Sequence, residues 1–166
     1  MPGSSPPPPL TSLSDLPAQM GSAGFAVLAG FMVISAISLL PGVVDLSNQS
    51  SEAHHLSHAA QFMLGGLLAL GIGSRQALKR SISASVPWWA WVAVIVAPVV
   101  MLLLMTPGIY NPLETRSFLH LLYHWGIIIL GLVTGWACVR FGRVSGMAIF
   151  VMSVAMGALF AGGVGG

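Results

Sequence analysis

Five histidines are the residues of this chain best suited to chemistry. Three lie in the segment HHLSH, as His54, His55 and His58, and two lie in the segment HLLYH, as His120 and His124. Neutral imidazole is a common ligand of transition metals, and two histidines spaced i, i+4 on a helix can clamp one ion. Both segments contain such a pair. The spacing therefore indicates a metal site built from two helices.

The composition indicates where those helices lie. Charged residues make up 6% of the 166 residues and apolar residues 55%, with a mean hydropathy of +0.88. A soluble domain carries roughly 25% charged residues. We therefore predict an integral membrane protein, in contact with the lipid bilayer. The net charge of +2 comes from scattered residues, which excludes a nucleic-acid partner, and the single cysteine excludes an internal disulfide.

The predicted fold class is all-α: a polytopic membrane protein with a bundle of about five transmembrane helices. A membrane-spanning helix needs about 20 apolar residues. Five stretches qualify, namely Met20–Leu40, Ser57–Ser74, Pro87–Met105, Phe118–Val139 and Ser145–Val164. Residues 1–19 are predicted to be a Pro-rich N-terminal tail, and residues 20–166 a single transmembrane domain.

The basic residues predict the orientation of the bundle. Five of the six follow the second and fourth spans: Arg75, Lys79, Arg80, Arg140 and Arg143. Loops rich in Lys and Arg stay in the cytoplasm. We therefore expect the N-terminus inside, the C-terminus outside, and all five histidines at the outer face.

Small residues continue the histidine stripe on both helices. Gly65 and Ala69 follow His54 and His58 on one face, and Gly131 and Gly135 share a face with His120 and His124. Small residues let membrane helices approach closely. The second and fourth spans are therefore predicted to pack together, so that the imidazoles converge.

The position of each histidine along its span predicts its importance. We expect His58 and His124, the deepest in their spans, to form the centre of the site, with His120 and His54 next. His54 and His55 are expected nearer the water. His55 is rotated about 100° from His54 on a helix, which makes it the most dispensable. Ser50 or Ser51 is expected to cap this helix.

The chemistry of the site remains open among three readings. A site of nitrogen ligands without thiolates suits copper or zinc. Alternatively, His58 and His124 could ligate the iron of a haem b in a quinol-linked electron-transfer subunit. In the third reading nothing is bound, and the histidines make hydrogen bonds in a purely structural subunit. No nucleophile triad, P-loop or paired-carboxylate motif is present, so we do not expect catalysis by this chain alone.

Two segments resemble helices of known membrane families. AHHLSHAAQFMLGGLLALGIG (53–73) resembles histidine-bearing helices of the CtaG-like proteins, which are linked to assembly of haem–copper oxidases. NPLETRSFLHLLYHWGIIILGLVTG (111–135) is similar to helices of small prokaryotic membrane families. The resemblance implies metal contacts at His58, His120 and His124. The CtaG-like proteins have about seven spans, whereas five are predicted here. We therefore expect an accessory or assembly subunit of a redox complex in a prokaryotic cytoplasmic membrane, with other membrane subunits as partners.

Overall fold

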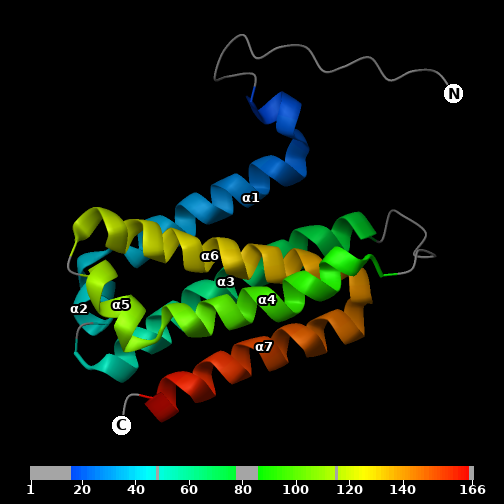
Figure 1. Ribbon diagram of the computed structural model, residues 1–166. Coiled ribbons are helices and arrows are strands. Elements are labelled where there is room, and N and C mark those ends of the chain that lie inside the picture. Colours follow the sequence, from blue (N-terminus) through cyan, green and yellow to red (C-terminus); the bar gives the residue numbers. More distant parts are fainter. Residues whose placement is uncertain (1–15, 48, 78–85, 115, 165–166) are drawn as a thin grey trace, which may run out of the picture.

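The computed structural model describes residues 16–47, 49–77, 86–114 and 116–164, and every element in these ranges is helical (Figure 1). This confirms the all-α prediction. The elements are α1 (Leu16–Ser38), α2 (Pro41–Ser47), α3 (Ser51–Ala77), α4 (Trp88–Leu104), α5 (Pro107–Glu114), α6 (Ser117–Cys138), the 3₁₀ turn η2 (Val139–Phe141) and α7 (Arg143–Val164).

Each predicted span corresponds to one long helix, with different boundaries. Helix α1 begins at Leu16, within the predicted tail, and the tail residues 1–15 lie outside the described part of the chain. Helix α3 begins at Ser51 instead of Ser57, where the backbone N–H of Ala53 donates to Ser50 Oγ at 3.1 Å. The predicted cap at Ser50 is therefore confirmed. The short helices α2 and α5, in stretches expected to be loops, were not predicted.

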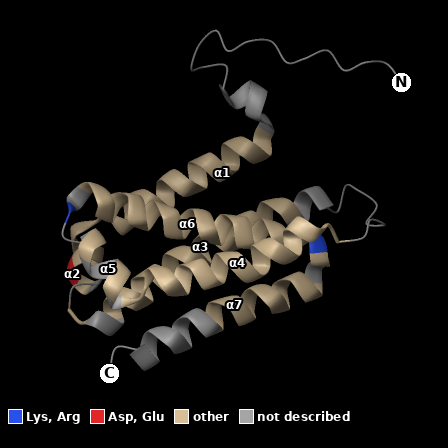
Figure 2. Cartoon of the chain, viewed as in Figure 1, with Lys and Arg blue, Asp and Glu red and all other residues tan. Residues whose placement is uncertain are grey.

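Two segments are long and apolar enough to cross a membrane. They are Ala53–Gly73, within α3, and the stretch Phe118–Phe141, formed by α6 and η2. The other long helices contain shorter apolar stretches: Ser22–Ser38, Trp88–Leu104 and Val144–Ala155. Figure 2 shows that most of the described chain carries neither acidic nor basic residues. Membrane location is therefore indicated by the length and composition of two helices.

Helices α3 and α6 form the centre of the bundle and run parallel to each other. Their closest approaches pair Phe62 with Gly131 and Gly66 with Gly135, so positions advance in the same direction on both helices. Helices α1, α4 and α7 pack against this pair. All five histidines lie in the first turns of α3 and α6, and we call this end of the bundle the histidine end.

The contact between α3 and α6 is made by glycines. A Cβ atom on Gly131 would collide with the carbonyl oxygen of Phe62, and one on Gly135 with that of Gly66. A Cβ on Gly65 would lie 2.5 Å from the carbonyl oxygen of Ile128. Only the absence of a side chain lets the two backbones come this close. The predicted packing of these two helices is therefore confirmed.

The bundle closes with a sharp turn between α6 and α7. Helix α6 tightens into η2, and Gly142 follows with φ of 86°. This left-handed backbone conformation favours glycine, because a side chain there would be strained. The turn lets Phe150 of α7 fold back onto Phe62 of α3, where the two rings stack with centroids 6.4 Å apart. The apolar core of the bundle forms around this contact.

Candidate histidine centre

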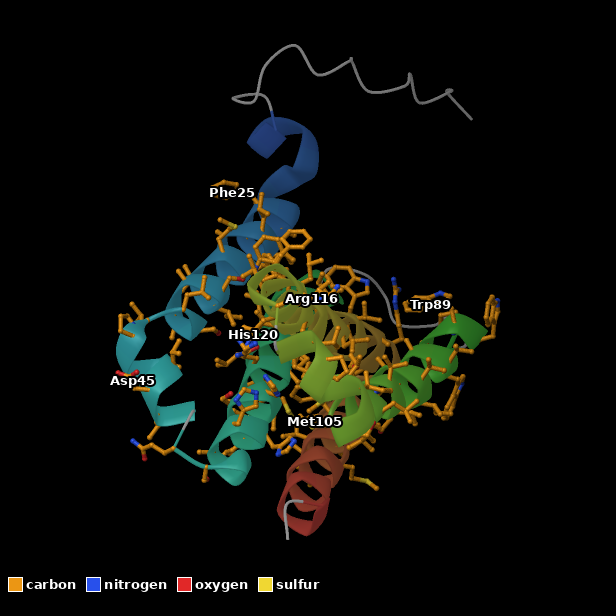
Figure 3. All side chains as sticks on the ribbon, turned by 60° about the vertical axis from the view of Figure 1, so that its left-hand side comes forward. Phe25, Asp45, Trp89, Met105, Arg116 and His120 are labelled. Atoms are coloured by element: carbon orange, nitrogen blue, oxygen red, sulfur yellow. The ribbon has the colours of Figure 1, made fainter. Side chains whose placement is uncertain are left out.

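Four histidine side chains from two helices meet at the histidine end. The ring centroids of His54 and His58 are 4.3 Å apart, and those of His120 and His124 are 4.4 Å apart. The two helices are joined by His58 and His124, with 4.8 Å between ring centroids. The His54 ring lies 6.5 Å from the rings of both His120 and His124. We call these four residues the histidine cluster. In Figure 3, the labelled His120 marks its position.

Burial of the histidines differs in part from the prediction. The exposed fraction is 0% for His58, 4% for His54, 7% for His55 and 8% for His124, whereas His120 is half-buried. The expectation that His54 and His55 lie nearer the water is wrong. Helix α3 starts earlier than predicted, and α2 packs against it, so its first turn is covered by protein.

His55 belongs to the same turn of α3 as His54. Its ring is 6.3 Å from that of His54, with the two planes at 89°. Consecutive helical residues differ by about 100° in direction, so both rings cannot face α6 equally. The expectation that His55 is the most dispensable histidine therefore stays a prediction.

Gln61 fixes the orientation of the His124 ring. His124 Nδ1 lies 2.8 Å from Gln61 Oε1, one turn below His58 on α3. The amide oxygen can only accept, so Nδ1 carries the proton, and in the neutral ring Nε2 carries the lone pair. His120 Nε2 lies 2.9 Å from His124 Nε2 and therefore donates to it. These contacts form a chain from Gln61 through His124 to His120.

Tyr123 orients the His58 ring in a similar way. The phenol donates its only proton to the carbonyl oxygen of Leu104, at the end of α4, over 3.2 Å. Its oxygen lies 3.5 Å from His58 Nδ1 and can therefore act only as an acceptor there. His58 then holds its proton on Nδ1, and Nε2 carries the lone pair. In both His58 and His124, Nδ1 thus holds the proton and faces an oxygen atom. The lone pair is on Nε2, on the other side of the ring.

Sequence analysis gave no role to Gln61 or Tyr123. Gln61 lies on the face of α3 that carries His54 and His58, and Tyr123 is the fourth residue of HLLYH, but neither pattern predicts a contact. A signal for both was present, since polar side chains within apolar spans are costly and usually have a partner. The partner of Tyr123 belongs to α4, which no spacing within HLLYH could indicate.

The nitrogen atoms of the histidine cluster form one close pair. Among the described residues, no set of three or more His, Cys, Asp and Glu side chains is arranged so that it could hold a metal. The nearest pair is His120 Nε2 and His124 Nε2, 2.9 Å apart. Two nitrogens bound to one ion at roughly 2.0–2.1 Å would be about 2.9 Å apart at the 90° angles of tetragonal Cu(II), and about 3.3 Å apart at the tetrahedral angles of zinc. The hydrogen-bonded distance of this pair is therefore also the separation of two adjacent ligands of a tetragonal copper ion.

No protein-family model, curated protein or solved structure matches this chain. The resemblance of residues 53–73 and 111–135 to membrane families accordingly stays a hypothesis.

Proposed function

We propose that this is a multi-pass membrane protein whose histidine cluster binds one transition metal ion, copper or zinc, at the outer face of the membrane. The single observation that carries the proposal is the pair of oriented rings. His58 and His124 each direct Nδ1 toward an oxygen, from Tyr123 and Gln61 respectively. Metal-binding histidines almost always donate the second ring N–H to such a partner, which fixes the ring and raises its basicity.

The ion would take the place of the proton between His120 and His124. Each nitrogen of this pair can offer a lone pair once the His120 proton moves to its other ring nitrogen, and their 2.9 Å separation already suits two adjacent ligands. A third ligand requires His58 or His54 to turn its ring toward that point, because no three-ligand set exists among the described residues. The donors would be nitrogens only, which suits copper or zinc.

The narrow space between the helices favours an ion over haem b. A porphyrin between His58 and His124 would need room beside the glycines below them. The facing backbone fills the space beside those glycines: the carbonyl of Phe62 lies against Gly131, and that of Ile128 lies against Gly65. Accommodating a haem would require α3 and α6 to separate along their closest contact.

The second candidate is a structural subunit without a cofactor. It is favoured by the hydrogen-bond chain Gln61–His124–His120, which satisfies these buried groups without an ion. In this case, the cluster would serve as a polar contact that fixes how α3 and α6 pair. The two candidates differ in one measurable property, the presence of bound metal.

The experiment is metal analysis together with an optical spectrum of the purified protein, followed by titration with Cu(II), Cu(I) or Zn(II). We expect about one ion per chain and no Soret band. His124→Ala and His58→Ala should lose the ion, and His55→Ala, which changes a neighbouring buried histidine, should retain it. A Soret band would show that the protein binds haem. Absence of both metal and haem, with all three variants folded, would show that it is a structural subunit without a cofactor.

The larger context is an accessory or assembly subunit of a redox complex in a prokaryotic cytoplasmic membrane. An all-nitrogen metal site suits such a subunit, and the resemblance of residues 53–73 points the same way. Purification from native membranes should recover other membrane subunits with the wild-type chain. Recovery of the chain alone under mild detergent would contradict this part of the proposal.

The membrane arrangement proposed is five spans, α1, α3, α4, α6 and α7, with the histidine end outside. It is supported by the parallel course of α3 and α6 and by the basic residues that follow both helices. The test is thiol labelling of intact cells. In a Cys138→Ser background, a Gln76→Cys variant should not react with an impermeant reagent, whereas Gln49→Cys should. The reverse pattern would place the histidines inside.

A further inference from the structure

An apolar groove lies in the half of the bundle away from the histidines. It has a volume of about 360 Å³ and is lined by Val27, Ala69, Trp89, Leu132, Val133 and Trp136. Four helices, α1, α3, α4 and α6, contribute to this lining. Val133 and Trp89 are exposed, so the groove opens to the surroundings of the bundle. On a membrane-spanning bundle those surroundings are lipid chains.

One basic residue stands beside this groove. The guanidinium carbon of Arg140 lies 5.5 Å from the ring centroid of Trp89, which is the distance of a cation–π contact. Arg140 is exposed and is the middle residue of η2, which follows α6. Trp91, also in the first turn of α4, packs edge-on against Phe141, with ring centroids 4.6 Å apart. These two contacts tie the start of α4 to η2, so the cation is held at one end of the groove.

The tryptophans place this end of the groove near the membrane surface. Trp88, Trp89 and Trp91 are all exposed at the start of α4, and exposed tryptophans concentrate at the level of lipid headgroups. Arg140 lies in η2, after the last residue of α6, and is therefore at the opposite end of that helix from the histidine end. Figure 2 shows basic segments near both ends of α6. An arginine at headgroup depth attracts phosphate, which a guanidinium can bind through two parallel N–H donors.

We propose that Arg140 and the groove form a binding site for one anionic phospholipid. The phosphate would lie against the Arg140 guanidinium, and one hydrocarbon chain would lie along Val133, Leu132 and Val27. The charge of Arg140 selects the headgroup, and the apolar lining selects a chain over a free anion. The inference depends on the membrane placement of α6 and is independent of the histidine cluster.

The test is native mass spectrometry of the purified full chain, titrated in detergent with phosphatidylglycerol, phosphatidylcholine or inorganic phosphate. The wild type should retain phosphatidylglycerol at least several-fold better than phosphatidylcholine, and should not bind inorganic phosphate. One basic residue near the surface contributes about 1 kcal/mol, or about fivefold in affinity. Arg140→Gln should therefore lower phosphatidylglycerol retention about fivefold, and Arg116→Gln, at the other end of α6, should leave it unchanged.

A second variant tests the groove apart from the charge. Val133→Trp fills the groove from an exposed position, so the bundle should still fold. It should reduce retention of both phospholipids, whereas Met152→Trp, on an exposed face of α7, should not. Equal retention of the two lipids by the wild type, or equal effects of Arg140→Gln and Arg116→Gln, would overturn the proposal. Binding of inorganic phosphate alone would show an anion site without the lipid. His124→Ala should leave lipid retention intact, which separates this result from the metal proposal.

Discussion

Helices α3 and α6 meet in two different ways along one shared face. In their first turns the imidazoles of His58 and His124 stand between them, with ring centroids 4.8 Å apart. Farther along, Gly131 and Gly135 let the backbones touch at Phe62 and Gly66. The same two helices are thus separated by polar rings at one end and in direct contact at the other. The difference follows from side-chain size on the shared face: imidazole rings hold the helices apart, and glycines allow the backbones to touch.

The glycine contact also explains how the histidines are held. A direct backbone contact permits little sliding or rotation, because the facing carbonyls and glycines fit at one register only. Phe62 is one turn from His58, and Ile128 is one turn from His124. The contact therefore fixes the register of the turns that carry the rings. Precise positioning of a site depends on such support from rigid elements below it.

The largest expected effect comes from breaking the glycine contact. Gly131→Ala places a Cβ against the Phe62 carbonyl, whereas Gly126→Ala on the same helix adds a Cβ where nothing lies within 4 Å. Overpacking of this kind costs about 1–3 kcal/mol. Unfolding in mixed detergents should show Gly131→Ala as clearly destabilised, and Gly126→Ala as neutral or slightly stabilised because alanine is the better helix former. Equal stability of the two variants would mean that the backbones are not in contact.

A smaller effect is expected from removing the oxygen behind His124. Gln61→Leu keeps the packing volume but removes the oxygen that accepts the Nδ1 proton of His124. Without this hydrogen bond, the orientation of the His124 ring is no longer fixed. Loss of such a partner typically lowers metal affinity about 10–100-fold. Competition titration with a chelator of known affinity measures this.

Two further substitutions make the Gln61 result specific. Gln61→Glu keeps an accepting oxygen and should retain affinity near that of the wild type. Gln49→Leu removes an exposed glutamine just before α3 and should change nothing. If Gln61→Leu and Gln49→Leu bind metal equally well, Gln61 does not orient a ligand.

The smallest effect is expected at Tyr123. Tyr123→Phe removes the hydroxyl that links His58 to the Leu104 carbonyl while leaving the ring in place. A single hydrogen bond contributes about 0.5–1.5 kcal/mol, so metal affinity should fall about two- to tenfold. Thr134→Val is the matched control, since it removes a hydroxyl bonded within α6 to Leu130 and away from the cluster. A larger loss in Thr134→Val would show that the effect is general loosening of α6.

The sequence was informative where spacing along one helix sufficed. The i, i+4 histidines and the glycines on the same stripes predicted that α3 and α6 pair and that the rings converge, and the structure confirms both. It was uninformative where a contact joins distant segments. The Leu104 carbonyl that orients Tyr123 belongs to α4, and α2, which packs against α3, lies in a stretch predicted to be a loop. Such contacts arise only once the bundle has folded.

The parallel course of α3 and α6 has a consequence for biosynthesis. The ribosome completes α3 and then α4 before it makes His120 and His124, so three histidines and Gln61 must wait for their partners. In the proposed membrane arrangement, the histidines in the first turns of α3 would stay within reach of water at the membrane surface until α6 is made, because polar groups are costly in lipid. The glycines of α3 are apolar and would wait inside the bilayer. Assembly would then have a direction in time: a chain arrested before Ser117 would present an open, hydrated half of the histidine cluster, and only synthesis of α6 would close it.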